Sequence, residues 1–117
     1  MYNYINLDYI DLMTDGDNDM KATMLEMLLE EMPVEIEKMK DHLEAQEWES
    51  LFKAAHKMKS TLSFIGNESM TQANISIEHN AKHEENFDQI PQMLSVLENT
   101  YLNAVLEIQA AIQAANN

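Results

Sequence analysis

The chain has 117 residues, the length of one domain, and we expect a single domain over residues 1–117. It contains no Cys, which excludes a disulfide scaffold, a thiolate zinc site and a cysteine nucleophile. Its 21 acidic residues face only seven Lys, and the net charge of −14 argues against nucleic acid or an anionic membrane as a partner. The sequence has neither a signal peptide nor an apolar run of about 18 residues. We therefore expect a cytoplasmic, acidic protein, and a monomer.

Apolar residues recur every three or four positions along nearly the whole chain, which predicts α-helices and no strand. A short helix is expected over about residues 7–13, ended by the turn at residues 14–17. The next helix begins at Asp17 or Asn18, because a short side-chain oxygen there accepts a free backbone N–H. Pro33 either bends this helix or starts another one. Its apolar face, expected to point inward, comprises Met20, Met24, Met27, Leu28 and Met32.

Three further helices are expected over residues 47–65, 68–83 and 89–115. Gly66 stands where a left-handed cap would end the first of them. Amphipathic helices joined by short connections bury their apolar faces by folding back on each other. The sequence therefore predicts an all-α fold, an antiparallel up-and-down four-helix bundle with a short extra N-terminal helix. Most of the ten Met residues are expected to fill its core rather than line an exposed groove.

One segment differs in charge from the rest of the chain. Residues 51–67 contain no Asp or Glu, but they contain His56 and three Lys: Lys53, Lys57 and Lys59. At about 100° per residue, His56 lies roughly 120° from the centre of the buried face, and Lys59 and Ser60 lie one turn further on. We therefore predict an exposed imidazole beside an ammonium group, an arrangement suited to a phosphoryl group.

Other chemistry is less well supported. His42, His79 and His83 lie among carboxylates in the sequence, which would repel phosphate. His79 and His83 have the spacing of a two-His metal site but lack the Glu of the zinc-protease pattern, so we predict no metal site. Asp15, Asp17, Asp19 and Glu26 match four positions of a calcium loop, but Met20 replaces the Gly of its turn, and helix capping is the simpler interpretation. Without a Gly-rich loop, no ATP site is expected.

The run from Ala55 to Gly66 resembles the signature of histidine-containing phosphotransfer (HPt) domains. In that family a phospho-accepting His on a bundle helix is followed by Lys three residues later, Gly or Ser four later, and Gly ten later. The corresponding residues here are His56, Lys59, Ser60 and Gly66. An aromatic N-terminal segment, Pro33 and two following helices extend the resemblance over nearly the whole chain.

The resemblance implies a phosphocarrier rather than an enzyme, a phosphorelay intermediate in two-component signalling. His56 would accept a phosphoryl group through Nε2 from a receiver-domain aspartate or a kinase and pass it to another receiver. Lys59 would stabilise phosphoryl charge, and Ser60, Ser63 and Gly66 would support the site. The expected partners are response-regulator receiver domains and a sensor or hybrid kinase; no cofactor is expected, because the receiver brings the magnesium ion. The expected docking residues are Phe52, Lys53, Lys57 and Phe64.

Two other functions fit the sequence. The bundle could dock on a receiver or kinase without accepting phosphate, since Leu62 and Phe64 are bulky residues near the site. It could instead be the His-bearing domain of a larger sensor kinase, although an initial Met without an evident linker favours a free-standing protein.

Overall fold

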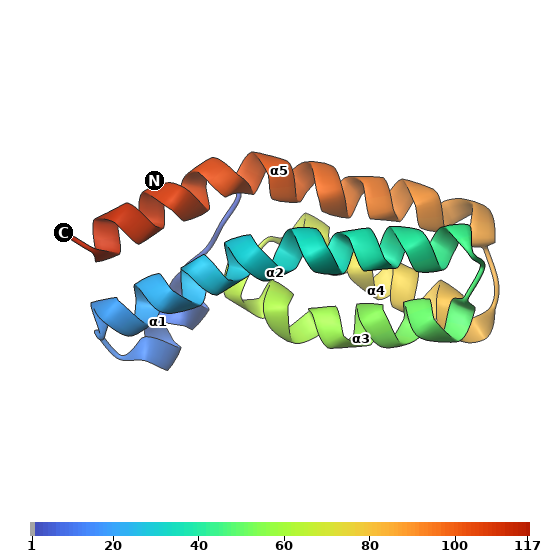
Figure 1. The fold of residues 1–117 in the computed structure, drawn as a ribbon, viewed down its shortest axis with the longest axis horizontal. Coiled ribbons are helices and arrows are strands. Elements are labelled where there is room, and N and C mark those ends of the chain that lie inside the picture. Colours follow the sequence, from blue (N-terminus) through green and yellow to red (C-terminus); the bar gives the residue numbers. More distant parts are fainter. Residues whose placement is uncertain (1) are drawn as a thin grey trace.

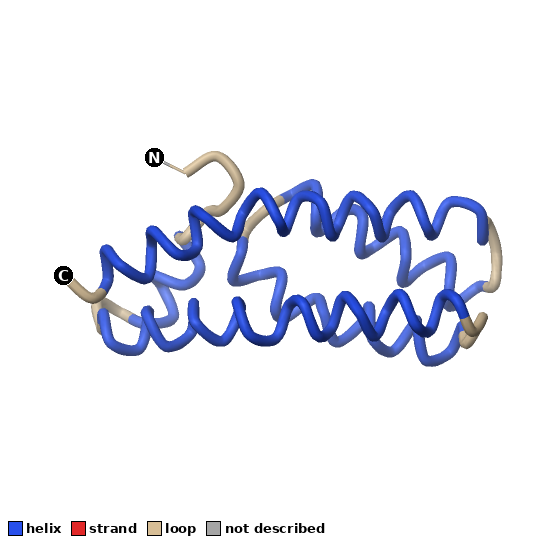
Figure 2. Tube along the Cα trace, turned by 45° about the horizontal axis from the view of Figure 1, so that its top comes forward, coloured by secondary structure: helices blue, strands red, loops and turns tan. Residues whose placement is uncertain are grey.

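Four long helices packed side by side form the body of the molecule, which measures 46 × 20 × 20 Å (Figures 1 and 2). The computed structural model describes residues 2–117, and within them every regular element is a helix. In chain order these are α1 (Asp8–Thr14), α2 (Asn18–Glu44), α3 (Trp48–Ile65), α4 (Glu68–His83), the 3-10 turn η1 (Phe87–Gln89) and α5 (Ile90–Ala115). Each of α2 to α5 packs on the next, and α5 returns to α2, which closes the ring. The predicted all-α bundle is confirmed.

Local signals in the sequence set the ends of the helices. The Asp17 side chain accepts a hydrogen bond from the Met20 backbone N–H at 2.9 Å and caps α2. Asn67 caps α4 in the same way through Met70 N–H at 3.0 Å. Gly66 ends α3 with φ = +69°, the left-handed conformation predicted for it. Of the two alternatives for Pro33, a second helix is wrong, because α2 continues through this residue.

The core runs along the axis of the bundle and is made of aliphatic and Met side chains. Its largest fully buried members are Ile10, Leu25, Met32, Met39, Leu51, Met58, Leu62, Ile65, Met70, Ile77, Ile90 and Leu97. Burial of each such side chain contributes about 1.5–3 kcal/mol, so these residues account for much of the stability of the fold. No helix within residues 2–117 is long and apolar enough to cross a membrane.

The predicted inward face of the first half of α2 is partly wrong. Met20 and Met27 are 48% and 47% exposed, whereas Ala22 and Leu25 are buried. Two overlapping apolar stripes run along this helix about one residue, or 100°, apart, and hydropathy does not distinguish them. The stripe that contains Ala22 and Leu25 is the one that faces the core. Met24 and Met27 instead line a small apolar depression with Phe64.

The residues before α1 form a strap, residues 3–6, that crosses the end of the bundle where α2 and α5 extend beyond α3 and α4 (Figure 1). Glu107 of α5 holds this strap by one carboxylate, which accepts backbone N–H bonds from Asn3, Tyr4 and Ile5 at 2.9, 2.7 and 3.2 Å. The strap therefore fixes the N-terminal segment on α5.

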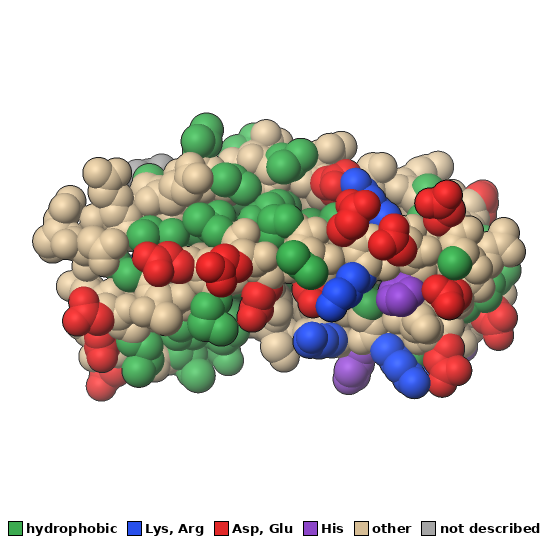
Figure 3. Space-filling model, viewed as in Figure 1, with side chains coloured by type: hydrophobic (Ala, Val, Ile, Leu, Met, Phe, Trp, Pro, Cys, Tyr) green, Lys and Arg blue, Asp and Glu red, His purple; other side chains and the backbone are tan. Residues whose placement is uncertain are grey.

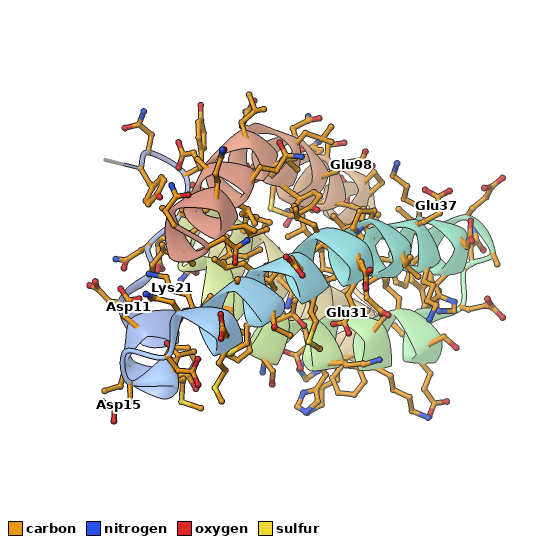
Figure 4. The ribbon with its side chains drawn as sticks, turned by 60° about the vertical axis from the view of Figure 1, so that its left-hand side comes forward. Asp11, Asp15, Lys21, Glu31, Glu37 and Glu98 are labelled. Atoms are coloured by element: carbon orange, nitrogen blue, oxygen red, sulfur yellow. The ribbon has the colours of Figure 1, made fainter. Side chains whose placement is uncertain are left out.

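The strap also closes the end of α3. Asn6 N–H donates to the Ile65 carbonyl at 2.8 Å, and the Asn67 side chain donates to the Tyr4 carbonyl at 2.9 Å. Helix α1, which follows, is tied to α2 by an ion pair of 2.6 Å between Lys21 and Asp11, which face each other in Figure 4. The N-terminal helix is thus part of the folded unit.

Candidate functional site

His56 lies near the middle of α3 and points away from the core. Its side chain is 66% exposed, whereas its neighbour Ala55 is fully buried. The predicted exposure of this imidazole is confirmed. Figure 3 shows Lys and His side chains gathered over α3, in contrast to the acidic side chains along α2 on the same face. The ring of Phe52, one turn earlier, lies 6.0 Å from the imidazole, centroid to centroid.

A buried carboxylate from the next helix holds the imidazole. Glu78 on α4 is only 8% exposed, and its Oε2 lies 2.7 Å from Nδ1 of His56. A carboxylate only accepts hydrogen bonds, so Nδ1 carries the proton and donates it to Glu78. In the neutral ring, Nε2 then keeps its lone pair and is the nitrogen free to react. The geometry thus selects one tautomer and fixes the orientation of the ring.

Lys59 shares the same carboxylate. Its Nζ lies 2.7 Å from Oε1 of Glu78, and its side chain is 50% exposed. Burial raises the pKa of Glu78, but hydrogen bonds from Lys59 and His56 outweigh it, so the pKa of this carboxyl lies below its usual value. Glu78 is therefore ionised at neutral pH. An ammonium has three donors, and Lys59 uses one of them here, so two remain for another anion in the hollow that His56 and Lys59 both line.

A second contact from α4 holds α3 beside the imidazole. One turn before Glu78, the buried Asn74 donates to the Ala55 carbonyl at 2.8 Å. Asn74 and Glu78 lie one turn apart on α4 and hold two consecutive residues of α3, which makes the position of the imidazole rigid.

The other predicted site residues are arranged along both edges of α3. Ser60 is exposed one turn after His56, and the Ser63 hydroxyl donates to the Lys59 carbonyl at 3.0 Å, within its own helix. Lys53 and Lys57 lie on the edge toward α2. Phe64 lies further along this edge and packs on Tyr9 of α1, with ring centroids 5.4 Å apart. The structure therefore brings His56, Lys59 and Phe52 together and leaves Phe64 two turns away.

Residues 51–67 contain no acidic residue, but carboxylates lie beside their Lys side chains in the fold. Each Lys of the segment has a carboxylate within 4 Å: Lys53 has Glu49, Lys57 has Glu35 and Lys59 has Glu78. Two of these carboxylates come from other helices, which a count along one helix omits. Glu78 is the residue that sequence reasoning missed; its position four residues after the buried Asn74 is the only local signal for it.

His79 and His83, which have acidic neighbours in the sequence, lie close to His56 in the fold. Both line an open hollow beside it, together with Phe52, Lys59, Ile75, Glu78 and Lys82. Their rings are 4.5 Å apart, and His79 pairs with Glu85 at 3.0 Å. Within residues 2–117 no group of three or more His, Cys, Asp or Glu is arranged to hold a metal ion.

Comparison with known proteins assigns most of the chain to one family. The family model for the Hpt domain matches residues 23–115, which include α3, α4, α5 and nearly all of α2. Helix α1 and the strap lie outside this match. No curated protein and no solved structure matches the chain closely enough to be counted as similar. Because the match covers well over half of its length, the chain belongs to the Hpt domain family, the histidine phosphotransfer modules of two-component signalling systems.

Proposed function

We propose that this protein is a phosphorelay intermediate that accepts a phosphoryl group on His56 from a receiver-domain aspartate, or from a kinase, and passes it to another receiver. One observation carries the proposal. His56 is exposed on a rigid helix, with Nδ1 bound to Glu78 and Nε2 free toward solvent.

The chemical step follows from that arrangement. The Nε2 lone pair attacks phosphorus in line with the P–O bond of an aspartyl phosphate; the N–P bond forms, and the P–O bond breaks to release the aspartate carboxylate. Because Nδ1 keeps its proton, the ring gains positive charge as the N–P bond forms. Glu78, 2.7 Å away, stabilises that charge and holds the ring in line. The reverse step on a second receiver returns the ring to its neutral state.

Lys59 is proposed to bind the phosphoryl group. Two N–H donors of its ammonium are not used by Glu78, and they can bind the phosphoryl oxygens in the hollow that Lys59 shares with His56, while the partner supplies the magnesium ion. Ser60 is small, so a receiver can approach the ring closely. Phe52, Lys53, Lys57 and Phe64 form the proposed docking surface, and the exposed side chain of Met27 enlarges its apolar part.

The alternative of a module that docks without accepting phosphate depends on the bulk of Leu62 and Phe64. Leu62 is 2% exposed and belongs to the core, and Phe64 packs on Tyr9 two turns from His56. Neither side chain covers Nε2, so this alternative has no observation in its favour. A role as the His-bearing domain of a larger kinase uses the same site and the same chemistry.

The test is transfer of label from a phosphorylated receiver to the purified protein. We expect an acid-labile, base-stable phosphoprotein with the wild-type chain and none with His56→Gln. His79→Gln and His83→Gln are the matched controls, since both residues line the same hollow, and both variants should retain transfer. Undiminished transfer to His56→Gln contradicts the assignment of His56. The assignment is also contradicted if His79→Gln and His83→Gln lose transfer while His56→Gln retains it.

A further inference from the structure

The outer face of the C-terminal half of α5 is uncharged, although the protein as a whole is strongly acidic. Of the 21 acidic residues, only Glu107 lies within residues 99–117, and none of the seven Lys does. The Glu107 carboxylate is occupied by three backbone N–H groups of the strap. A protein of net charge −14 therefore has one long helical face without free carboxylates.

Two Leu residues lie at the centre of this face. Leu106 is 75% exposed and Leu102 is 60% exposed, and they are one turn apart on the same side of α5. The helical register places Leu106 opposite the buried residues of α5, so it points directly away from the core. Around the pair are exposed Ala and amide side chains: Asn99, Asn103, Gln109, Ala110 and Gln113. We call these seven residues the α5 face.

The chemistry of the α5 face matches a second copy of itself. In a two-fold symmetric pair the same patch meets itself, so a patch that carries a single sign of charge would oppose its own charges. Leu packs on Leu, and the amides of Asn and Gln both donate and accept, so an amide rim can pair with its own copy. The other strongly exposed Leu, Leu12, lies on α1 between acidic residues, where two copies would bring carboxylates together.

We propose that the α5 face is a self-association surface, through which two copies of this chain pair by their α5 helices. The net charge of −14 opposes association of two copies, and this face carries no free charge that adds to the repulsion. Helix α5 packs on α2 and α4, whereas His56 is on α3 across the bundle (Figure 1). Both His56 side chains of the pair stay accessible, so association is compatible with phosphotransfer.

The size of the α5 face indicates a weak and reversible pair. The seventeen residues of α5 from Asn99 to Ala115 span about 26 Å, and a helix is about 10 Å wide, which gives a strip of about 260 Å² per copy. A stable interface buries about 800 Å² per partner. We therefore expect a dissociation constant on the order of 100 µM.

Sedimentation equilibrium of the full chain tests the proposal over about 10 µM to 1 mM, a range that brackets the expected constant. The wild-type average mass should rise with concentration toward twice the chain mass, and more so when salt is raised from about 10 to 150 mM, because salt screens the repulsion. Leu106→Glu should stay monomeric. The matched control is Leu12→Glu, since Leu12 is also 75% exposed and gains the same charge, and it should associate like the wild type.

A second readout locates the contact. The chain has no Cys, so a single introduced thiol reports only its own position. Gln109→Cys should form a covalent dimer on mild oxidation, whereas Glu49→Cys, at an 83% exposed side chain on α3, should not. Three results would each overturn the proposal. The wild-type chain could be monomeric at every concentration tested, Leu106→Glu could associate as strongly as the wild type, or Glu49→Cys could cross-link faster than Gln109→Cys.

Discussion

Gly66 is the position where one added methyl group should disturb the fold most, because two independent effects meet there. Its φ of +69° is unfavourable for any residue with a Cβ, at about 1–2 kcal/mol. A Cβ would also lie 2.5 Å from the Asn6 carbonyl oxygen and 2.9 Å from Asn6 Cβ. The first of these is a backbone atom, so the strap must move away.

Moving the strap breaks hydrogen bonds as well. The bond from Asn6 N–H to the Ile65 carbonyl, at 2.8 Å, is the nearest one, and such a bond contributes about 1 kcal/mol. We therefore expect Gly66→Ala to lower the free energy of unfolding by about 3 kcal/mol. At about 4 °C per kcal/mol for a domain of this size, the melting temperature should fall by about 12 °C.

Gly16→Ala is the matched control. Gly16 has φ = +85°, but a Cβ there would meet nothing within 4 Å. It should therefore show only the backbone effect, a fall of about 4–8 °C by thermal unfolding followed by circular dichroism. The difference between the two variants isolates the contact with the strap. Equal melting temperatures would refute the conclusion that the strap packs against Gly66.

Two further predictions concern carboxylates. Glu78→Gln keeps a hydrogen-bond acceptor for Nδ1 but removes the charge, so phosphotransfer to His56 should slow by about tenfold or more. Nitrogen NMR of the ring should report a less uniform tautomer, and an unchanged transfer rate would show that Glu78 is only structural. For Glu107, burial raises the pKa, but hydrogen bonds from Tyr4, Asn3 and Ile5 outweigh it, and the pKa lies below its usual value. Its stabilising effect is therefore present above the ordinary carboxyl pKa of about 4.3 and is lost as pH falls through the lower folded value. As pH falls from about 5 to about 3, the urea midpoint should decrease less in Glu107→Gln than in the wild type. An identical decrease in both proteins would contradict the conclusion that the Glu107 carboxylate stabilises the strap.

Features that depend only on neighbouring residues were predictable from the sequence. Asp17 caps α2 through the backbone three residues later, and Gly66 ends α3 through its own dihedral angles. The exposure of His56 follows from the period of one helix. The phase of the stripe on α2 was not predictable, because Met20 and Met27 are as apolar as the residues that α3 and α5 cover. Packing, and not hydropathy, selects between two stripes of equal strength.

The contact between His56 and Glu78 could not be predicted from the sequence. The two residues are 22 positions apart on different helices, and helical periodicity places each side chain only about its own axis. The rotation of α4 against α3 is fixed in part by the buried Asn74, which donates to the Ala55 carbonyl. A rotation of α4 by one residue, about 100°, would take Glu78 away from Nδ1 and leave the motif of α3 unchanged. The motif on α3 therefore specifies an exposed imidazole, while the packing of α4 decides which of its nitrogens can react.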